Sequence, residues 1–175
     1  INIYGPKVDK FDPKWKGKGM ILSNDNRRVQ YDPSIHRGQQ SAYCKKIIES
    51  GFHEWKFKII KTTDTSAHFM IGIWRCSNDT QPPINQFFTS GVDQGYGFCI
   101  DGATKTRSSD GCVLEKFGKI VKDADIVTMQ VDLDQLTLSW KINDKSYGKS
   151  HDISKDKYRA AIFMALGQKI VEIID

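Results

Sequence analysis

The stretch Asp125–Gly148, DIVTMQVDLDQLTLSWKINDKSYG, predicts three short β-strands in immediate succession. Every second residue is apolar along Val127–Leu133 and again along Leu136–Ile142. A period of two residues is typical of a strand with one face in the core and the other in water. The corner Asp134-Gln135 separates the first two strands, and Asn143-Asp144 is the turn before the third. The stretch therefore predicts an antiparallel meander.

The rest of the chain contains similar short runs separated by turn residues. Helical periodicity is almost absent, and only Ala42–Ser50 is predicted to form one or two helical turns. Short strands at this spacing predict an all-β antiparallel sandwich or barrel. The last two strands form a hairpin whose turn contains Gly167-Gln168. The strands predicted outside the meander are Gly19–Leu22, Arg27–Tyr31, Phe52–Ile60, His68–Arg75, Gly95–Ile100, Arg159–Leu166 and Lys169–Ile174.

Alternation also predicts which side chains point inward. In the meander, Trp140 lies on the apolar face and is predicted to be buried. The strand His68–Arg75 differs, because Met70 and Trp74 make it apolar on both faces. Such a strand is either central or covered by a loop. The inward residues predicted for Phe52–Ile60 are Trp55, Phe57 and Ile59.

Length and charge limit the classes of function. The 175 residues are enough for one domain with a sizeable core, and because the chain starts at Ile1 we expect a fragment of a longer protein. The net charge is +5, but the lysines are spread along the chain, which favours a solvated surface over a nucleic-acid face. No apolar run approaches the ~20 residues of a membrane span, so no membrane insertion is expected. We expect the isolated domain to be a monomer.

The four cysteines, Cys44, Cys76, Cys99 and Cys112, include no closely spaced pair. Zinc sites usually take their ligands in such pairs, so neither a structural metal nor another cofactor is expected. A chain with this much core does not need disulfides, which favours a reducing intracellular setting. The sequon Asn78-Asp79-Thr80 is the one contrary sign.

The connection Cys76–Gln94 is longer than the ~12–15 residues usual for a loop without secondary structure. It contains Phe87 and Phe88 in an otherwise polar segment. In an extended segment adjacent side chains point to opposite faces, so only one ring can enter the core. Either one phenylalanine fills the sandwich edge while the other packs on the loop, or the exposed ring anchors a partner. The sequence leaves both interpretations open.

Catalytic constellations are not evident in the sequence. Asp132 and Asp134 share a strand face, as a glycosidase pair would, but they lie opposite the apolar face and beside a turn. Solvated turn carboxylates are the preferred interpretation. The four histidines are isolated and no Gly-x-Ser-x-Gly elbow is present, so we expect structural roles for them. His53 is expected to bond local backbone groups, and His36 and His151 to lie in loops.

Five ordered motifs resemble those of the SPRY-domain family over about Trp15 to Asp175. The meander resembles the family's paired strands, in which Leu138-Ser139-Trp140 occupies the Leu-Ser-Phe position. It departs from the family pattern in its short first corner and in Asp144, which replaces a glycine. The other four segments similar to the family are GFHEWKFKI at Gly51–Ile59, FMIGIWR at Phe69–Arg75, GYGFCIDG at Gly95–Gly102, and YRAAIFMAL followed by KIVEII at the end.

The resemblance implies a bent, concanavalin A-like β-sandwich of two antiparallel sheets. It also implies a single non-catalytic domain, an adaptor that binds a peptide or a partner surface through loops at one end of the sandwich. Carried over by position, the partner-binding residues are Pro33, Ile35, Phe87, Phe88, Ala165, Leu166 and Gly167.

Three functions follow as hypotheses. The first is protein-protein interaction through those loops. The second is a glycan-binding lectin on the same architecture, which requires an exposed tryptophan or tyrosine beside a carboxylate. The third is nucleic-acid binding, which requires an affinity that falls steeply with salt.

Overall fold

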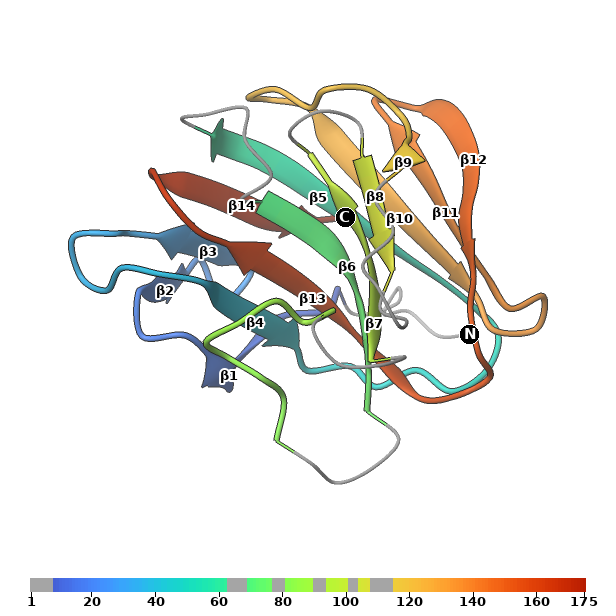
Figure 1. Ribbon diagram of the computed structural model, residues 1–175, viewed down its shortest axis with the longest axis horizontal. Coiled ribbons are helices and arrows are strands. Elements are labelled where there is room, and N and C mark those ends of the chain that lie inside the picture. Colours follow the sequence, from blue (N-terminus) through green and yellow to red (C-terminus); the bar gives the residue numbers. More distant parts are fainter. Residues whose placement is uncertain (1–7, 63–68, 77–80, 90–93, 101–103, 108–114) are drawn as a thin grey trace, which may run out of the picture.

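The computed structural model describes residues 8–62, 69–76, 81–89, 94–100, 104–107 and 115–175. In this part of the chain all regular secondary structure is β-strand, arranged as two sheets of seven strands each (Figure 1). All neighbouring strands pair antiparallel. The predicted all-β sandwich is therefore confirmed.

We call the two layers the first and the second sheet. The first contains, in spatial order, β1 (Phe11–Lys16), β4 (Gln40–Cys44), β13 (Tyr158–Met164), β6 (Phe69–Arg75), β7 (Gly95–Cys99), β8 (Thr104–Arg107) and β9 (Glu115–Lys116). The second contains β12 (Lys145–Asp152), β11 (Thr137–Ile142), β10 (Ile126–Asp132), β5 (Phe52–Thr62), β14 (Lys169–Ile174), β3 (Arg28–Tyr31) and β2 (Met20–Ser23).

The meander forms one half of the second sheet, as its alternation predicts. β10 pairs with β11 around the Asp134-Gln135 corner, and β11 pairs with β12 around Asn143 and Asp144. Both of these turn residues have positive φ, 49° and 67°, which is the geometry of a type I′ hairpin turn. Asp144 therefore takes the position of the family's glycine without loss of the turn.

The main core lies between the two sheets. Alternate residues of facing strands fill it. In the second sheet, strands such as β5 and β11 bury this face and leave the other more exposed. Trp140 is 1% exposed, which confirms its predicted place in the core. The predicted inward residues of β5 are buried as well, and these are Trp55, Phe57 and Ile59.

A second apolar cluster covers the outer face of the first sheet. Met70 and Trp74 of β6 point into it, whereas their neighbours on β6 point into the main core. Phe163 comes from the adjacent strand β13, Tyr43 from β4 beyond it, and Phe88 from the β6–β7 connection. The two-faced apolarity of β6 thus has the cause proposed from the sequence, since a loop covers its outer side.

The helical prediction for Ala42–Ser50 is wrong. Its first residues belong to β4, which pairs with β1 and β13, and the described chain contains no helix. All five residues of β4 are buried, because one face lies on the main core and the other lies under the β6–β7 connection. Burial on both faces removes the alternation by which a strand is recognised.

Candidate binding surface

β13 pairs with β4 and β14 pairs with β3, and these two pairings bring two loops to the same end of the sandwich. Met164 at the end of β13 pairs with Gln40, and Lys169 at the start of β14 pairs with Tyr31. The loop 32–39 begins after Tyr31 and ends before Gln40, so it lies beside the turn 165–168. Both are seen at the left of Figure 1. We call the surface formed by loop 32–39 and turn 165–168 the loop end.

Two large aliphatic side chains are exposed at the loop end. Ile35 is 56% exposed and Leu166 is 55% exposed. Pro33 and Gly167 are half-buried beside them, and Ala165 is buried. Exposed apolar groups on neighbouring loops are a common feature of interaction sites. The loop end thus presents two exposed aliphatic side chains on two separate segments.

Buried polar side chains hold both segments in place. Lys169 is fully buried, and its Nζ donates to the carbonyl oxygen of Leu166. Tyr31 Oη donates to the carbonyl oxygen of Gly38 at 2.9 Å, which ties down the second half of loop 32–39. A buried charged donor is costly unless it is hydrogen-bonded, so the contact from Lys169 fixes the turn firmly.

The backbone at Leu166 is strained. Its φ is 55° and that of Gly167 is 63°, so the turn has the two positive φ angles of a type I′ turn, although the strands it joins lie in different sheets. Glycine adopts this region readily, but a branched residue such as leucine does so at a cost of roughly 1–2 kcal/mol. Strained, exposed apolar residues are concentrated at functional sites.

The segment 81–89 of the β6–β7 connection, which we call the strap, crosses the outer face of the first sheet. Three hydrogen bonds join it to β4: Ser41 N–H to Ile84 O at 2.9 Å, Ser41 Oγ to Gln86 O at 2.6 Å, and Tyr43 Oη to Pro83 O at 2.6 Å. Burial raises the pKa of Tyr43, so its hydroxyl stays protonated and remains a donor.

The two strap phenylalanines have different environments. Phe88 is fully buried in the second cluster. Phe87 is half-buried and stacks on Phe163, with ring centroids 3.8 Å apart. Phe88 therefore supports the strap from below, and Phe87 retains the only exposed ring surface of the pair. Whether Phe87 or any of the other residues carried over from the family contacts a partner remains a prediction.

The candidate carboxylates serve turns, as the sequence interpretation expects. Asp132 Oδ1 accepts the backbone N–H groups of Asp134 and Gln135, each at 2.9 Å. Asp134 Oδ1 accepts the N–H of Gly51 at 3.2 Å. These bonds stabilise the β10–β11 corner and its contact with the start of β5. Both carboxylates therefore have structural roles.

Among the histidines, the assignment of His151 to a loop is wrong. It lies in β12 and is 5% exposed, with Nδ1 2.6 Å from Ser150 Oγ. His53 Nε2 lies 2.7 Å from the carbonyl oxygen of Ser50, as a residue serving local backbone would. His36 lies in loop 32–39, as expected. His68 and the sequon Asn78-Asp79-Thr80 fall outside the described residues.

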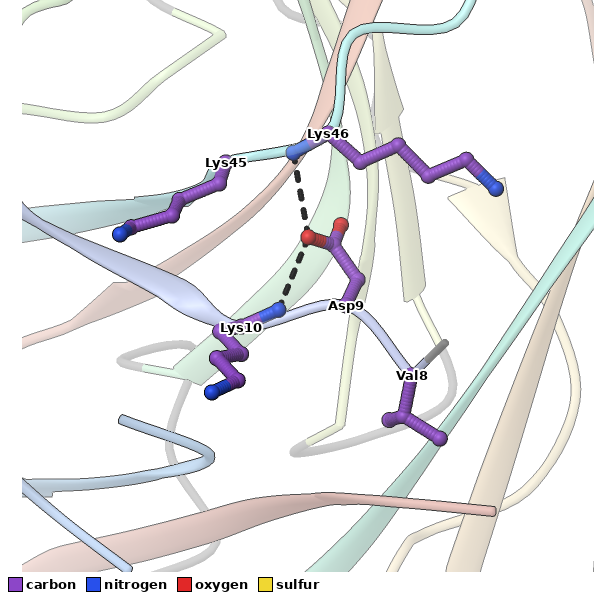
Figure 2. A pocket seen from close by; sticks show the side chains of 5 residues that line it. All are labelled: Val8, Asp9, Lys10, Lys45 and Lys46. Atoms are coloured by element: carbon purple, nitrogen blue, oxygen red, sulfur yellow. Dashed lines mark hydrogen bonds between the residues drawn. The ribbon is translucent and has the colours of Figure 1, made fainter. Parts of the chain in front are cut away.

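A shallow cavity of about 370 Å³ lies at the opposite end of the sandwich (Figure 2). Its lining includes Lys10, Lys45 and Lys46 around Asp9. The carboxylate of Asp9 accepts the N–H groups of Lys10 and Lys46 at 2.8 and 3.1 Å and that of Trp55 Nε1 at 2.9 Å. Asp9 thus connects β5 to the segments before β1 and after β4.

The described residues contain no group of three or more histidine, cysteine or carboxylate side chains arranged to hold a metal ion. Nor do they contain a helix of the length and apolarity required to cross a membrane.

The chain has the fold of SPRY domains. It superposes on the SPRY domain of human HERC1 with a TM-score of 0.75 and 17% identity, covering 94% of this chain and 97% of that one. The PSpry domain of TRIM65 gives a TM-score of 0.72 and 12% identity, covering 97% and 90%. Stonustoxin gives 0.64 and 15%, covering 96% of this chain and 27% of that chain. The bent sandwich predicted from the five motifs is therefore confirmed.

Comparison of the sequence itself gives no relative, since neither a protein-family model nor a curated protein matches it. At these identities the structural neighbours establish the fold alone.

Proposed function

We propose that this domain is a non-catalytic protein-interaction module that binds a peptide or partner surface at the loop end. The observation that carries the proposal is the pair Ile35 and Leu166, two exposed aliphatic side chains on two rigidly held segments. Rigid anchors lose little conformational entropy on binding, so their burial contributes more of its free energy to affinity. The SPRY fold supports the same kind of function.

The other residues carried over from the family take lesser parts in this proposal. Phe87, Pro33 and Gly167 are half-buried and supply the rim around the anchors. Phe88 and Ala165 are buried, and they shape the surface from below.

An intracellular setting belongs to the same proposal. Cys44 and Cys76 are free thiols, as is usual in a reducing compartment. Burial raises the pKa of Cys76, which keeps this thiol protonated and unreactive.

The lectin alternative is less well supported. A sugar-binding sandwich uses exposed aromatic rings as platforms for the sugar. Every described tryptophan and tyrosine is buried or half-buried, and the strongly exposed apolar residues of the loop end, Ile35 and Leu166, are aliphatic.

The proposal is tested with random dodecapeptides displayed on phage. Peptides selected on the wild-type domain are measured by calorimetry against Ile35→Ser and Leu166→Asn. Asparagine tolerates positive φ, so the second change replaces the apolar side chain with a polar one without adding backbone strain. We expect each change to weaken binding by at least ~1–2 kcal/mol, as loss of an interface anchor does.

The matched control is Phe52→Ser. Phe52 is 57% exposed and lies at the start of β5, away from the loop end, and its replacement should leave affinity unchanged. Peptides that bind the Ile35/Leu166 double variant as well as wild type would refute the proposed site. Failure to select any peptide would refute peptide binding.

A further inference from the structure

Cationic side chains surround the two anchors of the loop end. Arg37 follows Ile35 by two residues in loop 32–39 and is exposed. Lys61 lies at the end of β5, and its Nζ donates to Gln168 Oε1 at 3.1 Å in the turn that carries Leu166. A third cation comes from the turn between β1 and β2. The cationic side chains at the loop end therefore belong to three separate segments.

That third cation is Lys18, which is exposed. The next residue, Gly19, accepts the N–H of Asp32 on its carbonyl oxygen at 3.0 Å. Its own N–H donates to the buried Gln40 Oε1 at 2.8 Å. Lys18 is thus fixed beside the first residue of loop 32–39.

No carboxylate neutralises these cations within the described residues. None of the ion pairs found there includes Lys18, Arg37 or Lys61. The nearby carboxylates are bound to neutral donors instead. Asp32 accepts the N–H and the hydroxyl of Ser34 at 2.9 and 2.6 Å, bonds that lower its pKa. Asp123 accepts the N–H of Thr62 at 2.8 Å.

We infer that the loop end takes an acidic peptide in which an apolar residue is flanked by aspartate or glutamate. This rests on the proposed function and names its partner class. The apolar residue packs between Ile35 and Leu166, and the flanking carboxylates face Lys18, Arg37 and Lys61. Ammonium and guanidinium groups at the edge of an apolar site steer an anionic ligand and exclude a cationic one.

A peptide fits this surface better than a nucleic acid does. Single strands are held by aromatic rings on which the bases stack, together with cations. The strongly exposed apolar groups of the loop end, Ile35 and Leu166, are both aliphatic. Aliphatic anchors suit a leucine-like or aromatic side chain of a peptide.

The test uses the peptides selected from the random library and a charge-reversed variant, Lys18→Glu/Arg37→Glu. Its control is Lys45→Glu/Lys46→Glu, which makes the same change in net charge at the cavity of the opposite end (Figure 2). Association and dissociation rates are measured by surface plasmon resonance at low and high salt. The oligonucleotide dT20 serves as competitor.

We expect the selected peptides to be enriched in Asp and Glu next to one apolar residue. In Lys18→Glu/Arg37→Glu the association rate at low salt should fall about tenfold and lose its salt dependence, as steering by rim charges requires. The control should stay within about twofold of wild type. Leu166→Asn should act on the dissociation rate instead.

The outcomes separate the two proposals. If peptides without acidic enrichment bind the charge-reversed variant normally, yet fail on Leu166→Asn, the acidic partner class is wrong and the proposed site stands. If neither variant affects binding, both are wrong. Equal loss in the Lys45→Glu/Lys46→Glu control, or displacement of the peptide by dT20, would also overturn the acidic-peptide inference.

Discussion

At Leu166 an apolar side chain is exposed and its backbone is strained, and neither property stabilises the fold. The sequence predicts a hairpin of the last two strands with its turn at Gly167-Gln168. The turn is present, but the hairpin prediction is wrong, because β13 and β14 lie in different sheets and do not pair. The sequence does not predict that Leu166 adopts positive φ or that Lys169 is buried beneath it, since both follow from the pairing of β14 with distant strands. A lysine in a sequence is normally read as a surface residue.

Glu172 of β14 should make stability depend on pH. A hydrogen bond from Asn24 lowers its pKa, partial burial opposes this shift, and Arg28 adds to the lowering. The unfolded chain therefore binds this proton more readily, and the stabilisation is present above pH ~4.3 and is lost as the pH falls through the folded-state pKa.

In urea titrations we expect the free energy of unfolding of Glu172→Gln to fall less than that of wild type between about pH 5 and pH 3. Because Asp125 and Asp152 also have lowered pKa values, part of the dependence should remain in the variant. Parallel curves for the two proteins would show that Glu172 does not contribute.

Among the elements, alternation predicts the strands with one exposed face. β6, β7 and β13 are buried on both faces and were also predicted, whereas β4 was not. β5, β10 and β11 alternate clearly because water covers one side of each. β4 is buried on both faces, so its residues lack that pattern. β1 contains Pro13 and lies at a sheet edge, where a proline and polar residues are tolerated. Alternation therefore identifies the half-exposed strands of a sandwich.

The strap illustrates a second limit. The length of the Cys76–Gln94 connection and its two phenylalanines predicted a role in packing or in partner binding. The sequence does not predict which of the two rings is buried. Which ring is buried depends on the neighbouring strands. Phe87 stacks on Phe163 of β13, and Phe88 fills the space against Gly95 and Gly97 of β7. The contact between Phe87 and Phe163 joins residues far apart in the chain.

Phe88→Ala should therefore act on stability and not directly on affinity. Removing a fully buried ring is expected to lower the free energy of unfolding by ~3–5 kcal/mol. Phe87→Ala, at a half-buried position, should lower it by clearly less. Urea unfolding monitored by tryptophan fluorescence measures both, and equal losses for the two variants would contradict the assigned environments. A Phe87/Phe88 double variant is accordingly a poor probe of binding.

In the whole molecule, the last two strands occupy interior positions. β13 lies between β4 and β6 in the first sheet, and β14 lies between β5 and β3 in the second. Each sheet is therefore divided in two until the strands closest to residue 175 are in place. The ordered motifs predict strands at the C-terminal end, whereas their interior position comes from the topology alone.

Removal of residues 167–175, which contain β14, should abolish folding. The neighbours β3 and β5 would lose their pairing partner along a full strand. We expect the truncated protein to lose the sharp thermal transition seen by circular dichroism. Removal of Asp175 alone is the control, because it takes away only the exposed ion pair with Arg27 at 3.7 Å and should change little. A cooperative transition in the longer deletion would contradict the argument.

The interior position of β13 and β14 has a consequence for synthesis on the ribosome. Strands emerge in sequence order, so β3, β4, β5 and β6 leave the exit tunnel with unpaired edges and wait for partners not yet translated. At about 5–20 residues per second this wait lasts roughly 4–30 seconds. Exposed strand edges invite aggregation, so we expect the nascent domain to be most prone to aggregation until β13 and β14 complete the two sheets.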